Sequence, residues 1–186
     1  METEIRLLNS DDIEQVETVF LSAFKDDHIY NECGFELSGG LPDNFRLSIG
    51  YSVCSGSSVG YFEGGRMIAF ALGFDFHKCE GSRPDVMRAV FEIGEDGSSA
   101  YEELGPFFDK CASLKELYYM MSIAVIESRR REGIASKMLD FILSQVCKSI
   151  IGDVSSMISI PMYTKRGFSV QPLADGYKLV VLERHM

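Results

Sequence analysis

Apolar side chains recur along this chain with two spacings, every second residue and every third or fourth, and these spacings predict strands and helices. A short alternating stretch, Glu4–Leu8, predicts a first strand. A run with helical spacing follows and predicts a helix that ends near Phe24, with Ser10 or Asp11 as its cap. The apolar positions of this helix are Ile13, Val16, Phe20 and Phe24. Pro42–Ser55 is a weaker helical pattern, because it contains a glycine.

The middle of the chain predicts a hairpin, a helical region and a central strand. Two β-rich runs flank Glu63–Gly65, which is the pattern of a hairpin. Ser82–Ser113 has mainly helical character, and Pro84 and Pro106 are breaks or helix starts within it. Leu117–Ile126 is almost continuously apolar, as expected of a central strand that is covered on both faces.

The last third changes from strand to helix twice. After Gly133, an apolar and a polar stripe predict an amphipathic helix. The apolar stripe consists of Ile134, Met138, Ile142 and Val146, and the polar stripe of Lys137, Asp140, Ser144 and Lys148. Lys148–Val154 predicts another strand, Ser159–Gly167 a short helix, and the residues from Phe168 onward a closing hairpin. We therefore predict an α/β protein with a single domain over residues 1–186.

Composition narrows the possible partners. The net charge of −10 disfavours a nucleic-acid-binding surface and suits cationic small molecules. The five cysteines never form a Cys-x-x-Cys pair and the three histidines are isolated, so we expect neither a disulfide framework nor a metal site. The acidic N-terminus and the lack of a long apolar run predict a soluble, cytoplasmic protein without a membrane partner.

Three arginines and a glycine, within Arg129–Gly133, stand where the central strand gives way to the amphipathic helix. The first turn of such a helix has free N–H groups and the positive end of the helix dipole, so it binds anions, phosphate above all. Gly133 and the small Ala135 leave the backbone open to a ligand. The arginines can add charge at the rim of this site. The alternative is a solvated basic loop before an ordinary core helix, since neither a P-loop nor a dinucleotide fingerprint occurs here.

The pattern Arg130-x-x-Gly133-x-Ala135 resembles the R/Q-x-x-G-x-G/A signature of the GNAT superfamily of acetyl-CoA-dependent N-acetyltransferases. In that family the amides of this loop bind the pyrophosphate of CoA. Ile123–Val125 is similar to the family's central strand, whose backbone pairs with the pantetheine arm, and Met162–Phe168 is similar to its Y-x-K-x-G-F ending.

The resemblance extends from about Ser57 to the C-terminus and implies the GNAT fold, a mixed central sheet of about six to seven strands flanked by helices. It implies acetyl-CoA as co-substrate. The implied cofactor-binding residues are Ile123, Ala124, Val125, Arg130, Arg131, Glu132, Gly133, Ile134, Ala135 and Ser136. Arg131 stands where many members have a second glycine, and Ser156 lies near the place of an asparagine in many members.

Acetyl transfer to an amine needs an oxyanion stabiliser, an acid for the leaving thiolate and a base for the ammonium group. In the family the central strand bulges beside the thioester, so the resemblance implies a backbone N–H of Val125 or a neighbour as the oxyanion donor. It implies Tyr163, near the CoA sulfur, as the general acid. The alternative for Tyr163 is a core aromatic residue on a short helix.

The sequence FKDDHIY resembles the F-x-x-D-E-P-L element of the insect and nematode arylalkylamine N-acetyltransferases, with Asp27 at the position of the glutamate. The resemblance implies Asp27 as the base, and a solvated helix end is the alternative. Ser155 and Ser159 lie where related enzymes carry serines of the proton path. Ser159 can equally be the N-cap of the helix that starts at Pro161, which we favour.

Of the acetyltransferases, this chain is most like the arylalkylamine enzymes, so we expect it to acetylate a small primary amine. We expect direct transfer in a ternary complex, because none of the cysteines lies in a Cys–His setting. The alternatives are a polyamine, a protein amine, and a GNAT module that binds CoA without catalysis. We expect a monomer or a homodimer.

Overall fold

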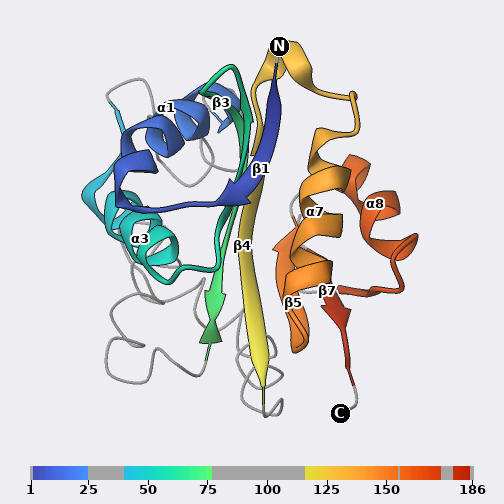
Figure 1. Ribbon diagram of the computed structural model, residues 1–186. Coiled ribbons are helices and arrows are strands. Elements are labelled where there is room, and N and C mark those ends of the chain that lie inside the picture. The colour runs from blue at the N-terminus through green and yellow to red at the C-terminus, as the bar shows by residue number, and fades with distance from the viewer. Residues whose placement is uncertain (1, 25–39, 77–115, 155, 173–177, 185–186) are drawn as a thin grey trace.

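The computed structural model describes residues 2–24, 40–76, 116–154, 156–172 and 178–184. It contains a seven-stranded sheet in the order β1-β2-β3-β4-β5-β7-β6 (Figure 1). The strands are β1 (Thr3–Leu7), β2 (Val59–Glu63), β3 (Arg66–Asp75), β4 (Leu117–Val125), β5 (Ser149–Val154), β6 (Ser169–Pro172) and β7 (Lys178–Leu182). Strands β4 and β5 are parallel and all other neighbours are antiparallel, so the predicted mixed sheet is confirmed.

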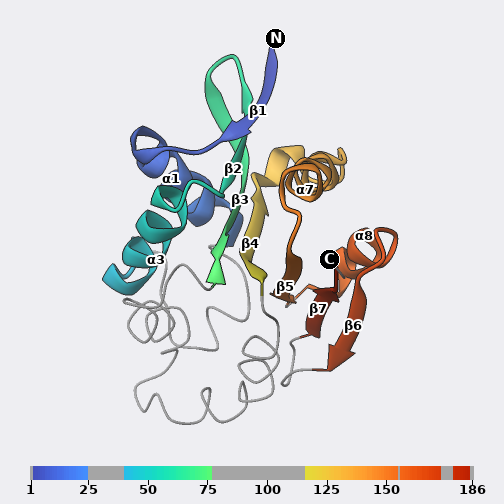
Figure 2. The same cartoon turned by 60° about the horizontal axis from the view of Figure 1, so that its bottom comes forward.

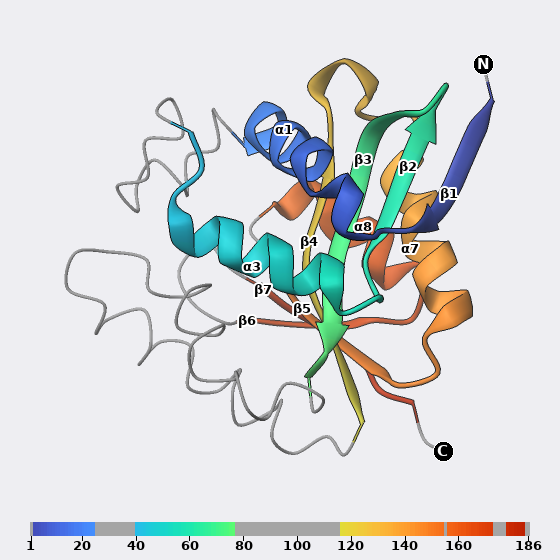
Figure 3. The same cartoon turned by 60° about the vertical axis from the view of Figure 1, so that its left-hand side comes forward.

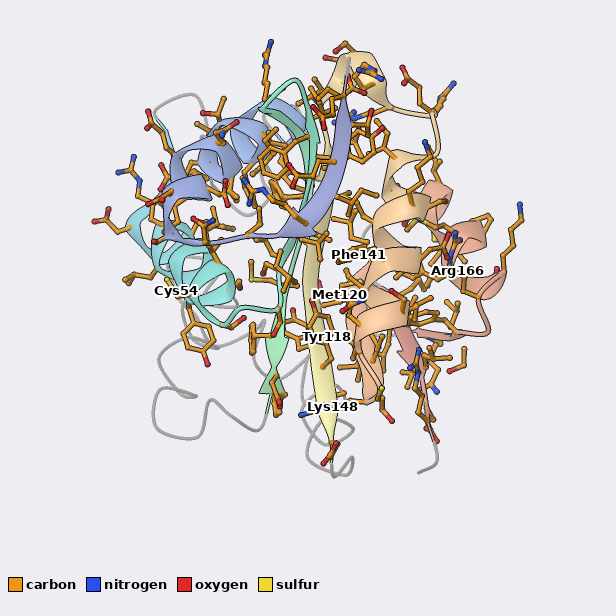
Figure 4. The ribbon with its side chains drawn as sticks, in the orientation of Figure 1. Cys54, Tyr118, Met120, Phe141, Lys148 and Arg166 are labelled. Carbon is orange, nitrogen blue, oxygen red and sulfur yellow. The ribbon has the colours of Figure 1, made fainter. Side chains whose placement is uncertain are left out.

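Helices cover both faces of this sheet (Figures 1, 2 and 3). One face carries η1 (Ser10–Asp12), α1 (Ile13–Phe24) and α3 (Asp43–Cys54), and the other carries α7 (Ile134–Gln145) and α8 (Ile160–Thr164), with η4 (Glu127–Arg129) and η5 (Met157–Ser159) in the connections. The predicted stripe of α7 is buried through Ile134, Met138 and Ile142. Figure 4 shows Met120 of β4 and Phe141 of α7 on this side of the sheet.

The start of the first helix differs from the prediction. Asn9, not Ser10 or Asp11, is the N-cap, and its Oδ1 accepts a hydrogen bond from the amide of Asp11 at 2.9 Å. The carboxylate of Asp12 completes a capping box by accepting from the amide of Asn9 at 3.0 Å, and it also binds Arg6. A 3₁₀ turn precedes the α-helix, so the cap lies earlier in the chain than the helical period suggested.

The other predicted elements agree with the structure where it describes them. The hairpin turns at Gly64 and Gly65, both with positive φ, and the central strand spans Leu117–Val125. The helical region predicted over Ser82–Ser113 lies mostly outside the described residues. No helix in the described part of the chain is long and apolar enough to span a membrane.

Candidate functional site

A gap opens between the two parallel strands at the centre of the sheet. Strands β4 and β5 pair only from Leu117↔Ser149 to Tyr119↔Ile151, whereas β4 continues to Val125 and stays paired with β3. Figure 1 shows β4 running along most of the molecule and β5 beside only its lower part. The second edge of β4 therefore has no strand partner among the described residues, and its backbone groups are free to bind an extended ligand.

The directions of the β4 backbone groups follow from its pairing with β3. The amide of Ile126 donates to the carbonyl oxygen of Ile68 at 3.1 Å, and successive N–H groups of a strand alternate in direction. The N–H groups of Val125 and Ile123 therefore point away from β3, toward the gap. These are the residues that the sequence predicted to pair with the pantetheine arm.

A β-bulge interrupts β4 at the start of its unpaired edge. Met120 pairs with Gly73 and Ser122 with Leu72, so Met121 has no partner on β3. The resemblance implied the oxyanion donor at Val125 or a neighbour, and the structure has the bulge four residues earlier. A bulge re-aims the side chains around it.

The bulge exchanges the faces toward which β4 side chains point. Before the bulge, the even-numbered residues Tyr118 and Met120 pack in the apolar cluster beneath α7. After the bulge, the odd-numbered residues Ile123 and Val125 pack in that cluster. Met121 packs in the cluster beneath α1 and α3. The side chain of Ser122 lies on the same face as Met121, because its partner Leu72 belongs to that cluster and paired residues share a face.

The loop that leads into α7 has the free amides of an anion site. Gly133 is the N-cap, no side chain caps the helix, and its first turn has no acidic residue. The first helical bond is donated by Lys137 to the carbonyl of Gly133 at 3.0 Å. Among the described residues, no acceptor binds the amides from Gly133 to Ser136, whereas Arg130 and Arg131 form a turn just before them. An anion placed here receives several N–H groups and the helix dipole together.

Two residues of this loop have a left-handed backbone. Gly133 has φ 77° and Arg131 has φ 67°. An added Cβ at Gly133 would meet no atom within 4 Å, so the backbone angle, and not a clash, favours glycine here. Arg131 tolerates the same region at a cost of about 1–2 kcal/mol. A glycine at position 131 would adopt this backbone without that cost.

The three arginines do not contribute equally to the charge of the site. Arg129 pairs with Glu63 and Glu132, and its guanidinium holds the pKa of both carboxyl groups below the usual range. Arg130 donates to the carbonyl oxygen of Ala23 at 2.6 Å and that of Val125 at 3.3 Å. Only Arg131 has no ion pair or hydrogen bond within the described part of the chain. The expectation that all three add charge at the rim is therefore wrong for Arg129.

Tyr163 lies on α8 and is 5% exposed. Its ring packs against Phe168 with centroids 5.5 Å apart. Burial raises the pKa of the Tyr163 phenol, and the negative charge of Asp153 raises it further. The phenol therefore keeps its proton at neutral pH, as a general acid must.

The remaining predicted residues have different outcomes. Ser159 occupies the N-cap position of α8, but its hydroxyl donates to the carbonyl oxygen of Ser156 at 2.6 Å and does not cap the helix. The N-cap position that we favoured for Ser159 is therefore confirmed, but the side-chain cap bond is absent, because Ser159 already has helical backbone angles as the end of a 3₁₀ turn. Asp27 and Ser155 lie outside the described residues.

Sequence analysis missed one acidic residue at the gap. Ile151 is the last β5 residue that pairs with β4, and Asp153 comes two residues after it. The Oδ1 atom of Asp153 accepts a hydrogen bond from the hydroxyl of Tyr119 at 2.6 Å. Burial raises the pKa of the Asp153 carboxyl, and the Tyr119 hydrogen bond opposes this with a smaller effect. A charged residue inside an otherwise apolar strand was the available signal.

The sequence matches no protein-family model and no curated protein. The fold, in contrast, is close to those of solved acetyltransferases. The Drosophila melanogaster polyamine N-acetyltransferase, described as catalysing the formation of N-acetylagmatine, is 14% identical, with a TM-score of 0.70 over 98% of this chain and 100% of the other. Arylalkylamine N-acetyltransferase 2 from Aedes aegypti is 13% identical, with a TM-score of 0.73 over 97% of each chain.

A third neighbour is the PaiA N-acetyltransferase from Thermoplasma acidophilum, whose structure contains coenzyme A. It is 12% identical, with a TM-score of 0.56 over all of both chains. At these identities the likeness shows the fold alone. The chain thus has the GNAT fold that its sequence predicted.

Proposed function

We propose that this protein is an acetyl-CoA-dependent N-acetyltransferase that acts on a small primary amine by direct transfer in a ternary complex. One observation carries this proposal, the row of amides from Gly133 to Ser136 that have no acceptor in the described part of the chain. This row of amides follows the end of β4, the strand whose unpaired edge borders the gap. The two features suit the two parts of CoA, since pyrophosphate needs clustered N–H groups and the pantetheine amides need a strand edge.

The cofactor would contact both features along its length. The proposed contacts are Ile123, Ala124 and Val125 for the pantetheine arm, and Arg130, Arg131, Glu132, Gly133, Ile134, Ala135 and Ser136 for the pyrophosphate. Within the second group, the backbone supplies most of the binding, and Arg131 supplies the free positive charge. Arg130 holds the loop against α1 through the carbonyl of Ala23.

Tyr163 is our candidate for the acid that protonates the CoA thiolate, because its phenol is buried and keeps its proton. Asp27, Ser155 and Ser159 remain candidates for the proton path by resemblance. Of these, Ser159 is described, and its hydroxyl is already bonded to a neighbouring carbonyl. A relay through Ser159 would therefore require that hydroxyl to turn.

For the acceptor we propose an arylalkylamine-like primary amine, supported by the fold of the Aedes enzyme and by the net charge of −10. A polyamine or agmatine-like cation is the alternative that the Drosophila enzyme favours. A protein amine, or a module that binds CoA without catalysis, would fit the same cofactor site. A cytoplasmic monomer or homodimer remains our expectation for the protein in the cell.

Thermal unfolding with added CoA tests the cofactor site. A ligand at one hundred times its Kd stabilises the native state by about 2.7 kcal/mol, so saturating acetyl-CoA or CoA should raise Tm clearly. Pantetheine, which lacks the pyrophosphate, should raise Tm much less at the same concentration. The lack of any shift with acetyl-CoA and CoA would refute the proposal. Thiol release with tyramine, dopamine, serotonin, spermidine, agmatine and lysine peptides then identifies the acceptor class.

A further inference from the structure

Asp153 and Tyr119 form a polar pair at the mouth of the gap between β4 and β5. Tyr119 is the last β4 residue that pairs with β5, opposite Ile151, and its hydroxyl reaches diagonally to the Asp153 carboxylate at 2.6 Å. The ring of Tyr119 packs edge-on against Phe74, with centroids 5.4 Å apart. The carboxylate is therefore fixed at the place where the two strands begin to separate.

This pair lies on the face of the sheet opposite α7. Ile150 and Val154, the β5 residues with the other side-chain direction, pack in the cluster beneath α7, so Asp153 points the other way. Ser122 of β4, whose hydroxyl is buried without a partner among the described residues, lies on that same face. The phosphate-binding amides stand at the N-terminus of α7, on the opposite face. A cofactor bound there would approach the gap from the α7 face, and the Asp153 carboxylate lies on the other face.

No cation in the described part of the chain neutralises Asp153. On β7 its partner is Leu179, and Lys178 is opposite Val154, whose side chain lies on the α7 face. Within the described residues, the other titratable groups near it are the two phenols, Tyr119 on β4 and Tyr163 on α8. Burying a carboxylate without a cationic partner is unfavourable, and such groups concentrate at functional sites.

We propose that Asp153 is the general base that takes the proton from the ammonium group of the acceptor, which enters from the face opposite α7. This inference rests on the proposed function and names a residue of the same site. The base would then lie on β5, a strand of the central sheet. Asp27, the candidate by resemblance, becomes the competing assignment.

The proton balance of the reaction is complete with two side chains. The Asp153 carboxylate accepts one proton from R–NH₃⁺, and the neutral amine attacks the thioester carbonyl, so that a C–N bond forms. The C–S bond then breaks and the thiolate takes the proton of Tyr163. The amide nitrogen loses its second proton to the Tyr163 phenolate, and Asp153 returns the first to water. The products are the N-acetyl amine, CoA thiol and one released proton.

Burial raises the pKa of Asp153, and the Tyr119 hydrogen bond lowers it. The base works only when ionised, so log kcat/KM for the amine should fall as pH drops through this pKa. Removal of the Tyr119 hydroxyl raises the pKa and should move this acid limb to higher pH. Tyr118→Phe is the matched control, because Tyr118 donates to the carbonyl of Ser57 and does not bind Asp153.

The test is the pH profile of kcat/KM for Asp153→Asn, Asp27→Asn, Tyr119→Phe and Tyr118→Phe. We expect Asp153→Asn to lose about 10²-fold or more in kcat/KM and to lose the acid limb, as for removal of a general base. Tyr119→Phe should move the limb upward, and Tyr118→Phe should leave it in place. The KM for acetyl-CoA should stay near the wild-type value in all of them.

Two outcomes would overturn the inference while leaving the proposed function intact. In one, the Asp153→Asn variant keeps the wild-type kcat/KM and the wild-type pH profile. In the other, Asp27→Asn removes the acid limb and Tyr119→Phe does not move it. The proposed function itself would be refuted if acetyl-CoA did not stabilise the wild-type protein and the protein did not acetylate any amine. The role of Asp153 would then be refuted with it.

Discussion

A single orphaned hydroxyl distinguishes the gap from the rest of the core. The Oγ atom of Ser122 is buried and has no hydrogen-bond partner among the described residues. Ser58 presents the opposite case, because its fully buried hydroxyl donates to the carbonyl of Ser52 at 2.8 Å and accepts from the amide of Gly73 at 3.1 Å. A buried polar group without a partner costs about 1–3 kcal/mol, so Ser122 is tolerated at some expense to the free protein.

Ser122→Ala should therefore leave the free energy of unfolding unchanged or raise it by up to about 1 kcal/mol, since it removes an unsatisfied group. Ser58→Ala should lower it by about 1–3 kcal/mol, because the Gly73 amide loses its acceptor. Urea unfolding of the two variants beside wild type gives both values. Equal destabilisation by the two substitutions would show that the Ser122 hydroxyl has a partner in the free protein.

At the scale of elements, the α7 N-terminus lacks the groups that usually stabilise the start of a helix. It has neither a side-chain cap nor an acidic residue in its first turn, although both would stabilise the helix. The end is held from outside instead. Arg166 donates to the carbonyl of Ser136 at 3.2 Å and binds Asp140 through two nitrogens, which ties the turn after α8 to α7 (Figure 4).

Ser136→Asp should separate stability from binding. A carboxylate in the first turn favours the helix dipole by about 0.3–1 kcal/mol, so Tm without ligand should rise slightly. The same charge repels the pyrophosphate, so the Kd of CoA should increase by about tenfold or more. Ser136→Asn, which has the same shape without the charge, is the control and should bind CoA nearly as wild type does. Unchanged CoA affinity in the Asp variant, measured by calorimetry, would place the phosphates elsewhere.

The sequence predicted these elements well where one pattern determined them. The amphipathic period of α7 and the apolar run of β4 gave their positions, because burial on one or both faces fixes each pattern. It did not predict the bulge at Met121 or the pair of Asp153 with Tyr119. Both depend on the register between strands that are far apart in sequence, and local periodicity carries no information on register.

At the scale of the whole molecule, the described carboxyl groups with a shifted pKa fall into two classes. In the first class the carboxylate links two neighbouring elements, as Asp12 does with Arg6 and Asp140 with Arg166, and these partners hold the pKa of each carboxyl below its ordinary value. Asp153 forms the second class, because burial raises its pKa and no cation offsets this among the described residues. The two classes must respond to pH with opposite signs.

Asp153→Asn and Asp140→Asn should show these signs in unfolding experiments between pH 3 and pH 8. The raised pKa of Asp153 means that its charge destabilises the native state above that pKa, so Asp153→Asn should be more stable than wild type near pH 7. This gain should vanish as pH falls and the wild-type carboxyl takes up its proton. Asn keeps an oxygen for the Tyr119 hydroxyl, so that contact does not mask the effect.

Asp140 should behave in the reverse way. Its lowered pKa contributes stability that is present above the unfolded value near 3.8 and is lost as pH falls through the native pKa. Asp140→Asn should therefore be less stable than wild type at pH 7, by no more than about 1 kcal/mol for an exposed pair, and the difference should shrink as pH falls below about 3.8. If Asp153→Asn instead lost stability at pH 7, the wild-type Asp153 carboxylate would stabilise the fold as Asp140 does. Its charge would then not be a destabilising one that is retained for proton transfer.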